Sequence, residues 1–111
     1  MKKINIIKES REFERIIKSN KSYKSKLFYI YLEKKEQENY KFGIAVGKKI
    51  GNAVLRNKRK RQIKEIISKN IYQNNFNCII ILKKEINNYN FQEINEQLNK
   101  ELKKLSIIKE K

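Results

Sequence analysis

Apolar residues recur along the chain with two different spacings, one typical of helices and one typical of strands. The first helical spacing lies within residues 9–19, where Phe13, Ile16 and Ile17 fall three or four positions apart and Ser10 stands where an N-cap is expected. This pattern predicts a short amphipathic helix.

Two strands are predicted next. Residues 26–33 are rich in aromatic and branched side chains, and residues 40–46 alternate so that Phe42 and Ile44 fall on one face. Both features are typical of strands with at least one buried face. Because only a short polar loop, residues 34–39, separates them, we expect the two strands to pair as an antiparallel hairpin.

A second helix is predicted to start at Ala53 or Leu55 and to end at Ser68, because Ile63, Ile66 and Ile67 share one apolar arc with Leu55. The run from residue 78 to residue 82 is apolar throughout. A strand without alternation is expected to be covered on both faces, so this run predicts a central strand.

The last predicted helix starts at Asn90, which with Glu93 makes a capping-box pattern, and its apolar spacing continues to Ile108. The predicted order is therefore α-β-β-α-β-α. This order and the length of 111 residues predict an α+β fold with helices packed on a small sheet, in a single domain spanning residues 1–111.

The charge balance is strongly basic. The chain has 28 Lys and Arg against 12 acidic residues, a formal net charge of +16. A surplus of this size opposes compaction by self-repulsion, so it predicts a polyanionic partner, with nucleic acid the first candidate. An AT-rich coding bias explains the preference for Lys over Arg, but it does not explain the surplus, because the same bias also supplies acidic residues.

The chain contains no His and no Asp; every acidic residue is Glu. General base catalysis near neutral pH usually uses His, and two-metal phosphodiester cleavage usually clusters Asp around the ions. A protein of this composition is expected to position a nucleic acid rather than cut it.

Two further features narrow the class of protein. The only cysteine, Cys78, lies in the apolar strand and is expected to be a buried core thiol. The sequence shows no apolar stretch of the roughly 20 residues that cross a bilayer and no signal-type core after Met1. We therefore expect a cytoplasmic protein that does not bind membranes.

The basic residues are concentrated at the start of the second predicted helix. Six of the 28 cationic side chains fall within the nine residues from 56 to 64. A solvated charged face is the simplest alternative, but six cations in nine residues repel one another, and only Glu65 lies next to them. The segment therefore predicts a helical surface for phosphates.

The same segment carries a specific motif. Residues 43–61 read GIAVGKKIGNAVLRNKRKR. The run Val46-Gly47-Lys48-Lys49-Ile50-Gly51, followed by Ala53-Val54-Leu55-Arg56-Asn57 and a Lys-Arg pair, resembles the signature of the bacterial ribonuclease P protein subunit. The aromatic strand, the apolar strand and the final helix are similar to the rest of that family.

This resemblance implies a non-catalytic protein whose partner RNA cleaves the 5′ leader from precursor tRNA, giving mature 5′ ends. The ribonuclease P RNA and precursor tRNA are then the partners, and no protein partner is required. Mg²⁺ would belong to the assembled enzyme and be held mainly by the RNA; no metal ligand is assigned to the protein, where Asn57 has at most an indirect role. The family also implies a left-handed crossover from the second strand through the basic helix to the third strand, against the usual right-handed preference.

The resemblance also assigns site residues. Those expected to contact the catalytic RNA are Lys48, Lys49, Arg56, Asn57, Lys58, Lys60, Arg61 and Lys64. Those expected to line a cleft for the single-stranded leader are Phe13, Ile17, Phe28 and Tyr31. Aromatic residues at such spacing are also typical of a core, so for Phe13 and Tyr31 both interpretations remain open.

The alternative function is a ribosomal or RNA-chaperone protein that binds structured RNA without a cleavage role; it shares the compositional features and lacks only the motif. A DNA-binding helix-turn-helix is disfavoured because residues 40–46, which precede the basic helix, read as a strand. A membrane-surface helix is disfavoured because the apolar arc is narrow and consists mostly of Ile.

Overall fold

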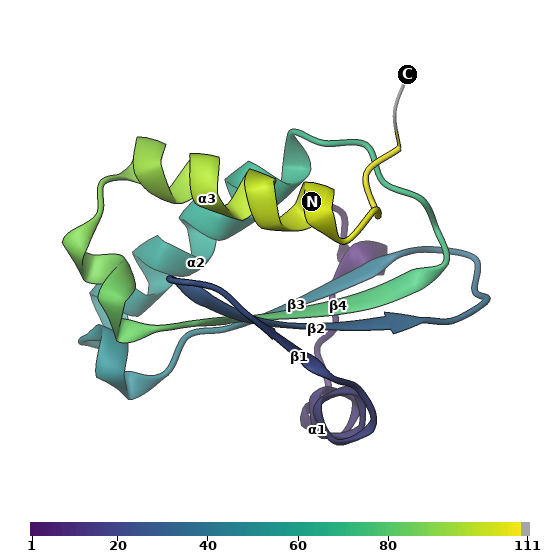
Figure 1. Ribbon diagram of the computed structural model, residues 1–111. Helices are drawn as coiled ribbons and strands as arrows, with labels where there is room; N and C mark the ends of the chain where they lie inside the picture. Colours follow the sequence, from purple (N-terminus) through teal and green to yellow (C-terminus); the bar gives the residue numbers. More distant parts are fainter. Residues whose placement is uncertain (110–111) are drawn as a thin grey trace.

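Four strands form one mixed sheet in the order β1-β2-β4-β3 (Figure 1). The structure is a computed structural model that describes residues 1–109. Its strands are β1 (Ser22–Lys24), β2 (Phe28–Lys34), β3 (Lys41–Ala45) and β4 (Phe76–Leu82). Strand β1 has no counterpart among the predicted elements, because it is only three residues long and carries no apolar pattern.

Strand β4 occupies the centre of the sheet, as its unbroken apolar run predicts. It pairs antiparallel with β2 and parallel with β3, so β2 and β3 do not pair with each other. The expected hairpin is therefore wrong. An apolar strand gains most when neighbours cover both its edges and both its faces, and β4 takes the position between β2 and β3 for this reason.

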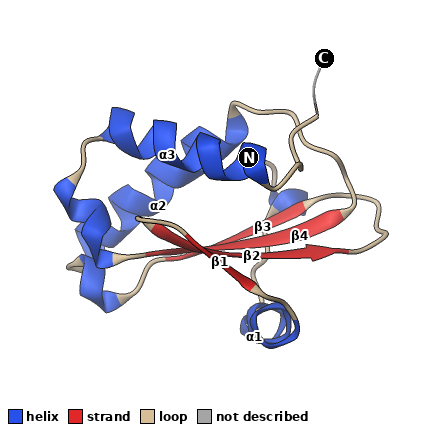
Figure 2. Cartoon of the chain, in the orientation of Figure 1, coloured by secondary structure: helices blue, strands red, loops and turns tan. Residues whose placement is uncertain are grey.

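Helices cover both faces of the sheet (Figure 2). Helices α2 (Ala53–Ser68) and α3 (Phe91–Lys104) lie on one face, and α1 (Ser10–Ser19) lies on the other. Three short 3₁₀ turns complete the chain: η1 (Lys3–Asn5), η2 (Lys48–Ile50) and η3 (Lys84–Asn88). The predicted α+β class and the order α-β-β-α-β-α are confirmed, with β1 added.

The connection from β3 through α2 to β4 is left-handed. In the view of Figure 1, β4 runs towards η3, β3 runs parallel to it farther from the viewer, and α2 crosses above both. With the strands pointing away from an observer, this path turns counter-clockwise. It is the hand implied by the family resemblance and the opposite of the usual one.

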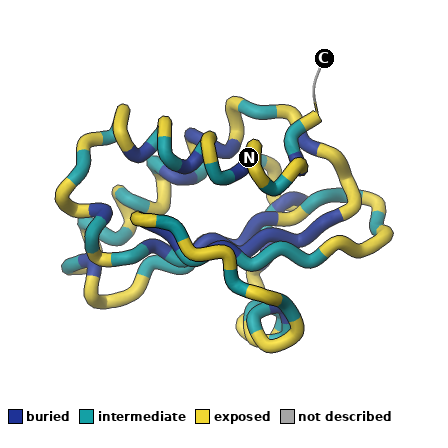
Figure 3. The backbone as a smooth tube through the Cα atoms, in the orientation of Figure 1, coloured by how far each residue is buried: buried dark blue, intermediate teal, exposed yellow. Residues whose placement is uncertain are grey.

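The central strands of the sheet are largely buried (Figure 3), and strand alternation divides their apolar residues between two faces. Phe28 and Ile30 of β2, Phe42 of β3 and Cys78 and Ile80 of β4 join α2 and α3 in the main core. The intervening residues face α1, where Ile7, Ile16 and Ile79 form a smaller buried cluster. Such alternation is expected when both faces of a sheet are covered by helices.

Two helices differ from their predicted bounds, each at one end. At the start of α1, Glu9 rather than Ser10 holds the N-cap position, and its side chain makes no capping hydrogen bond. At the other end of the chain, the Asn90–Glu93 capping box is present, but α3 ends at Lys104 instead of continuing to Ile108. Ser106 has φ 59°, which turns the chain so that Ile108 can pair with Tyr72.

The N-terminal segment covers the free edge of β3. Ile6 lies beside Phe42 as a parallel bridge, and the Ile7 amide donates to the Phe42 carbonyl at 2.9 Å. The buried Asn5 side chain donates to the Tyr40 carbonyl at 2.8 Å. Covering an edge in this way protects its unpaired backbone groups from other chains. Within residues 1–109, no helix is both long and apolar enough to span a membrane.

Candidate nucleic-acid interface

Helix α2 begins at a well-defined N-terminus. The Asn52 side chain accepts a hydrogen bond from the Leu55 amide at 2.9 Å, and the first turn contains no acidic residue. Gly51 precedes it with φ 148°, and a Cβ there would lie 2.7 Å from Leu55 Cδ2. The positive φ therefore favours glycine at this position, and a side chain there would also displace Leu55. The exposed N-terminus of a helix favours anions.

The predicted RNA-binding side chains of α2 form one continuous stripe. At 100° per residue, Arg56 falls at the angle of the buried Ile63 and Ile67, Lys60 and Lys64 lie at the border of that arc, and Asn57, Arg61 and Lys58 follow on the solvent side. Lys48 and Lys49 are exposed in η2, immediately before the helix. Within residues 1–109, none of these eight side chains takes part in an ion pair or donates a hydrogen bond.

Arg56 is a partly buried member of this stripe. Its Nε atom is buried and has no hydrogen-bond partner among the described residues. Arg56 and Asn57 line a cavity of about 240 Å³ together with Val46, Ala53 and Lys60. A buried guanidinium nitrogen without an acceptor is costly, so a phosphate oxygen in this cavity would remove a penalty as well as add a contact.

Arg59 differs from its neighbours, because its guanidinium already has partners. It donates to Asn87 at 3.1 and 3.3 Å and to Gln62 at 3.1 Å. Asn87 in turn donates to the Ile50 carbonyl at 2.7 Å. Arg59 therefore connects α2 to η3 and, through Asn87, to η2; it is not among the residues predicted to bind RNA.

A second cavity, of about 300 Å³, connects α2 with α1. Lys60 and Lys64 line one side of it, Phe13 lines another, and the N-terminal segment closes it at Ile6 and Ile7. Lys60 belongs to both cavities. The basic stripe and the predicted leader cleft are thus parts of one connected surface, although they come from segments far apart in the sequence.

Three of the four predicted cleft residues lie together where α1 packs against the sheet. Phe13, Ile17 and Tyr31 are half-buried and pack on the cluster of Ile7, Ile16 and Ile79. The Phe13 ring lies on β3, where a Cβ at Gly43 would be 2.6 Å from Phe13 Cζ. Gly43 therefore makes room for the ring.

Phe28 does not join them, so its assignment to the cleft is corrected. It is fully buried in the main core on the opposite face of the sheet. Phe28 and Tyr31 are three residues apart in one strand, and residues at an odd separation face opposite sides.

The aromatic residue that shares the face of Tyr31 is Tyr29, which the sequence analysis missed. Tyr29 is half-buried, faces Ile81 across the β2–β4 ladder, and has Lys83 Nζ 5.2 Å from its ring centroid. The period-2 spacing of Tyr29 and Tyr31 is the signal that could have found it.

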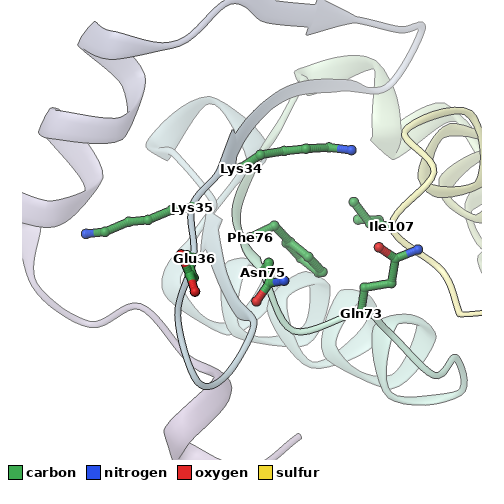
Figure 4. Close-up of a pocket in the computed structure, with 7 residues that line it drawn as sticks. All are labelled: Lys34, Lys35, Glu36, Gln73, Asn75, Phe76 and Ile107. Carbon is green, nitrogen blue, oxygen red and sulfur yellow. The ribbon is translucent and has the colours of Figure 1, made fainter.

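A larger groove, of about 480 Å³, lies apart from this surface (Figure 4). Its lining residues are Lys34, Lys35, Glu36, Gln73, Asn75, Phe76 and Ile107. In Figure 4 the ammonium groups of Lys34 and Lys35 point in opposite directions. This groove contains none of the predicted site residues and offers no converging polar groups.

Chemistry-bearing clusters are sparse in the described part of the chain. No group of three or more His, Cys, Asp or Glu side chains within residues 1–109 is arranged to hold a metal ion. Cys78 is fully buried, and this burial raises the pKa of its thiol. Because the thiolate is the reactive form, Cys78 is a core residue, as predicted.

Comparisons with known proteins agree with this geometry. The Ribonuclease P family model matches residues 1–106. The ribonuclease P protein component of Mycoplasma capricolum is 39% identical over 108 residues, covering 95% of this chain and 99% of the relative. That of Streptococcus pyogenes serotype M5 is 35% identical over 109 residues, covering 97% and 92%.

Solved structures give the same result. The RNase P protein of Staphylococcus aureus superposes with a TM-score of 0.84 at 31% identity, covering 95% of this chain and 98% of that chain. The RNase P protein from Thermotoga maritima gives a TM-score of 0.78 at 30% identity, covering 88% and 94%. The chain therefore belongs to the ribonuclease P protein family.

Proposed function

We propose that this chain is the protein subunit of a bacterial ribonuclease P and that residues 1–111 act as one RNA-binding domain. Helix α2 and the turn before it bind the catalytic RNA, and the cleft between α1 and the sheet holds the 5′ leader of precursor tRNA. The assembled enzyme hydrolyses one phosphodiester and leaves a mature tRNA with a 5′ phosphate. Because this RNA processing follows transcription, we expect the protein to act in the cytoplasm.

The polypeptide supports the reaction without supplying its chemistry. The chain has no His, which would be the usual proton-transfer group near neutral pH. We therefore assign the reacting groups and the Mg²⁺ ions to the RNA. The ions would neutralise charge and activate water at the scissile phosphate, and the protein would position the substrate.

The unpaired basic stripe supports the contact with the catalytic RNA. Arg56 and Arg61 can each fork two hydrogen bonds to one phosphate, whereas Lys48, Lys49 and Lys60 supply point charges. Asn57, beside Arg56 in the same cavity, can donate from its amide or orient a neighbouring group. Within residues 1–109 these groups have no acidic partner, so they lose no ion pair there when RNA binds.

The cleft beneath α1 supports the contact with the leader. Phe13, Tyr31 and Tyr29 offer ring surfaces, and Ile17 adds apolar contact. Stacking on aromatic residues contributes about 1–3 kcal/mol per base in single-strand complexes and tolerates any base. This suits a subunit that meets many different leader sequences and must bind precursor in preference to mature tRNA.

The observation that carries the proposal is the connection between the two parts. Lys60 lines both the cavity at Arg56 and the cavity at Phe13, so a catalytic RNA on α2 and a leader in the cleft would lie next to each other on one surface. Cations on this surface offset phosphate repulsion, which is otherwise screened by Mg²⁺. The protein is therefore expected to lower the Mg²⁺ concentration at which cleavage occurs.

The test is cleavage of a precursor tRNA by a bacterial ribonuclease P RNA at low millimolar Mg²⁺, with and without this protein. We expect removal of the 5′ leader only when the protein is present. At high Mg²⁺ the RNA alone should cleave, which controls for its folding. Tight RNA binding without any stimulation would instead support a ribosomal or RNA-chaperone role.

A further inference from the structure

A network of polar side chains ties α1 to the sheet on the face that carries the cleft. Arg15 donates from Nη1 to Glu33 Oε2 at 2.6 Å and from Nη2 to Glu33 Oε1 at 2.9 Å. Its Nη2 also donates to Glu12 Oε1 at 2.5 Å within α1. A fork on one carboxylate fixes the orientation of both groups, which a single hydrogen bond does not do.

Glu33 is itself held from the other side. Asn77, of which only 3% is exposed, donates from Nδ2 to Glu33 Oε1 at 2.8 Å. The Gln37 amide donates to Asn77 Oδ1 at 3.0 Å and also to the carbonyls of Asn39 and Phe76. These bonds hold the Asn77 side chain in place, so the Glu33 carboxylate is a fixed point on the sheet to which α1 attaches.

This attachment lies beside the cleft. On α1, Arg15 lies on one flank of the buried Ile16, and Phe13 and Ile17 lie on the other flank; on β2, Glu33 stands two residues beyond Tyr31 on the same face. The other fixed point is the Phe13 ring, which lies against Gly43. Between these two contacts, α1 has little freedom to move away from Tyr31.

We propose that Arg15 is a positioning residue for leader binding: through its fork on Glu33, it sets the distance between α1 and Tyr31. This inference rests on the proposed function, because it concerns the same cleft. Arg15 would affect binding only of substrates that carry a 5′ leader. Neither Arg15 nor Glu33 belongs to the basic stripe on α2, so affinity for the catalytic RNA should not depend on them.

A direct contact between Arg15 and a leader phosphate is the competing explanation, since the Arg15 side chain is 39% exposed. Replacing Glu33 by Gln separates the two. If Arg15 binds phosphate directly, Glu33→Gln leaves the guanidinium with Glu12 as its one carboxylate partner among the described residues and removes a negative charge, so leader binding strengthens. If Arg15 positions α1, Glu33→Gln weakens the fork, so leader binding falls even though the net charge becomes more positive.

The experiment measures the dissociation constants of precursor and mature tRNA with the reconstituted RNA–protein complex. The variants are Arg15→Met, Arg15→Lys and Glu33→Gln. The matched control is Glu101→Gln on α3, on the face of the sheet opposite the cleft. It removes the ion pair between Glu101 Oε2 and Lys104 Nζ, which are 3.5 Å apart. Thermal unfolding of each free protein and its affinity for the catalytic RNA are measured alongside.

We expect Arg15→Met and Glu33→Gln to weaken precursor binding about five- to tenfold, comparable to weakening one stacking contact, with mature tRNA unchanged. Arg15→Lys should fall between, because Lys cannot fork. The control should match the unsubstituted protein. A protein that is partly unfolded would lose both substrates equally, so the precursor-to-mature ratio separates positioning from misfolding.

Two results would overturn the inference. Tighter precursor binding by Glu33→Gln would assign Arg15 to direct phosphate contact, and an unchanged precursor-to-mature ratio in both variants would remove Arg15 from leader recognition. If instead the proposed function is wrong, the unsubstituted protein itself would show no preference for precursor over mature tRNA in the same complex.

Discussion

At the scale of single residues, Gly43 shows how one missing side chain shapes the cleft. A Cβ at this position would lie 2.6 Å from Phe13 Cζ, so Gly43→Ala should displace the Phe13 ring from β3. We expect weaker binding of precursor tRNA, by about threefold to tenfold, and a loss of about 1 kcal/mol in unfolding free energy from overpacking.

Gly47→Ala is the matched control, because a Cβ there meets nothing within 4 Å and the residue has φ −78°. Binding assays with precursor and mature tRNA, together with urea unfolding, test this expectation. Equal affinities for Gly43→Ala and Gly47→Ala would show that the Phe13 ring does not contribute to leader binding.

The neighbours Phe28 and Tyr29 are predicted to have opposite roles. Phe28 is fully buried in the main core, so Phe28→Ala should cost about 3–5 kcal/mol of unfolding free energy. Tyr29 is half-buried beside Tyr31, so Tyr29→Ala should leave the fold intact and weaken precursor binding about tenfold, with mature tRNA unaffected. Denaturant unfolding and binding assays on the two variants check the contrast. A large stability loss for Tyr29→Ala would place Tyr29 in the core.

At the scale of elements, the attachment of α1 depends on the charge of Glu33. The hydrogen bonds from Arg15, and secondarily from Asn77, lower the pKa of Glu33 from 4.5 to about 2. A carboxyl group whose pKa is lower in the folded state stabilises the fold above its unfolded pKa, and this contribution disappears as pH falls towards the folded pKa. The contribution, on the order of 2 kcal/mol, should therefore be complete above about pH 5 and decline towards pH 2.

The measurement compares the unfolding free energies of the unsubstituted protein and Glu33→Gln between pH 7 and pH 2. We expect a gap at neutral pH that narrows steadily below pH 5, since Gln does not titrate. Taking the difference cancels the titration of the carboxyl groups that do not interact with Glu33; Glu12, which shares Arg15 with Glu33, is not cancelled. A gap that keeps its size down to pH 2 would show that the charge of Glu33 does not stabilise the attachment.

Helix α2 is predicted to act through its charge. Lys60→Ala combined with Arg61→Ala removes two cations from the stripe, so the slope of log affinity for the catalytic RNA against log salt should flatten by about 1 to 2. Lys100→Ala with Lys103→Ala removes the same charge from exposed positions on α3 and serves as the control. An unchanged slope for the α2 pair would count against this surface.

The elements also show what sequence patterns can and cannot predict. Helix α2, its Asn-Gly-rich entry and the central place of β4 follow from local spacing, because amphipathic arcs and apolar runs depend on nearby residues. Pairing partners depend on the whole sheet: the run that forms β4 required a central position and so separated β2 from β3. Of the residues predicted for the leader cleft, Phe13, Ile17 and Tyr31 pack on one buried cluster, whereas the choice of Phe28 over Tyr29 ignored strand alternation.

At the scale of the whole molecule, the charge of +16 lowers the stability of the free protein, because cations that find no partner repel one another in the compact state. Many of these cations lie on the surface formed by α2, the N-terminal segment and α1, and those of the basic stripe on α2 make no ion pair within residues 1–109. A polyanion that binds this surface only in the folded state must stabilise the fold by mass action.

Sulfate is a simple probe of this coupling. At ten times its dissociation constant it should raise the unfolding temperature by about 5 °C more than sodium chloride at equal ionic strength. Sulfate also stabilises proteins by exclusion from their surface, and that effect is independent of the stripe. The Lys60→Ala, Arg61→Ala variant should therefore keep the exclusion effect and lose much of the specific gain, whereas the Lys100→Ala, Lys103→Ala control should keep both. Identical sulfate responses in the two variants would mean that the stripe does not gather anions in the free protein, and that its charge acts only once a folded RNA is present.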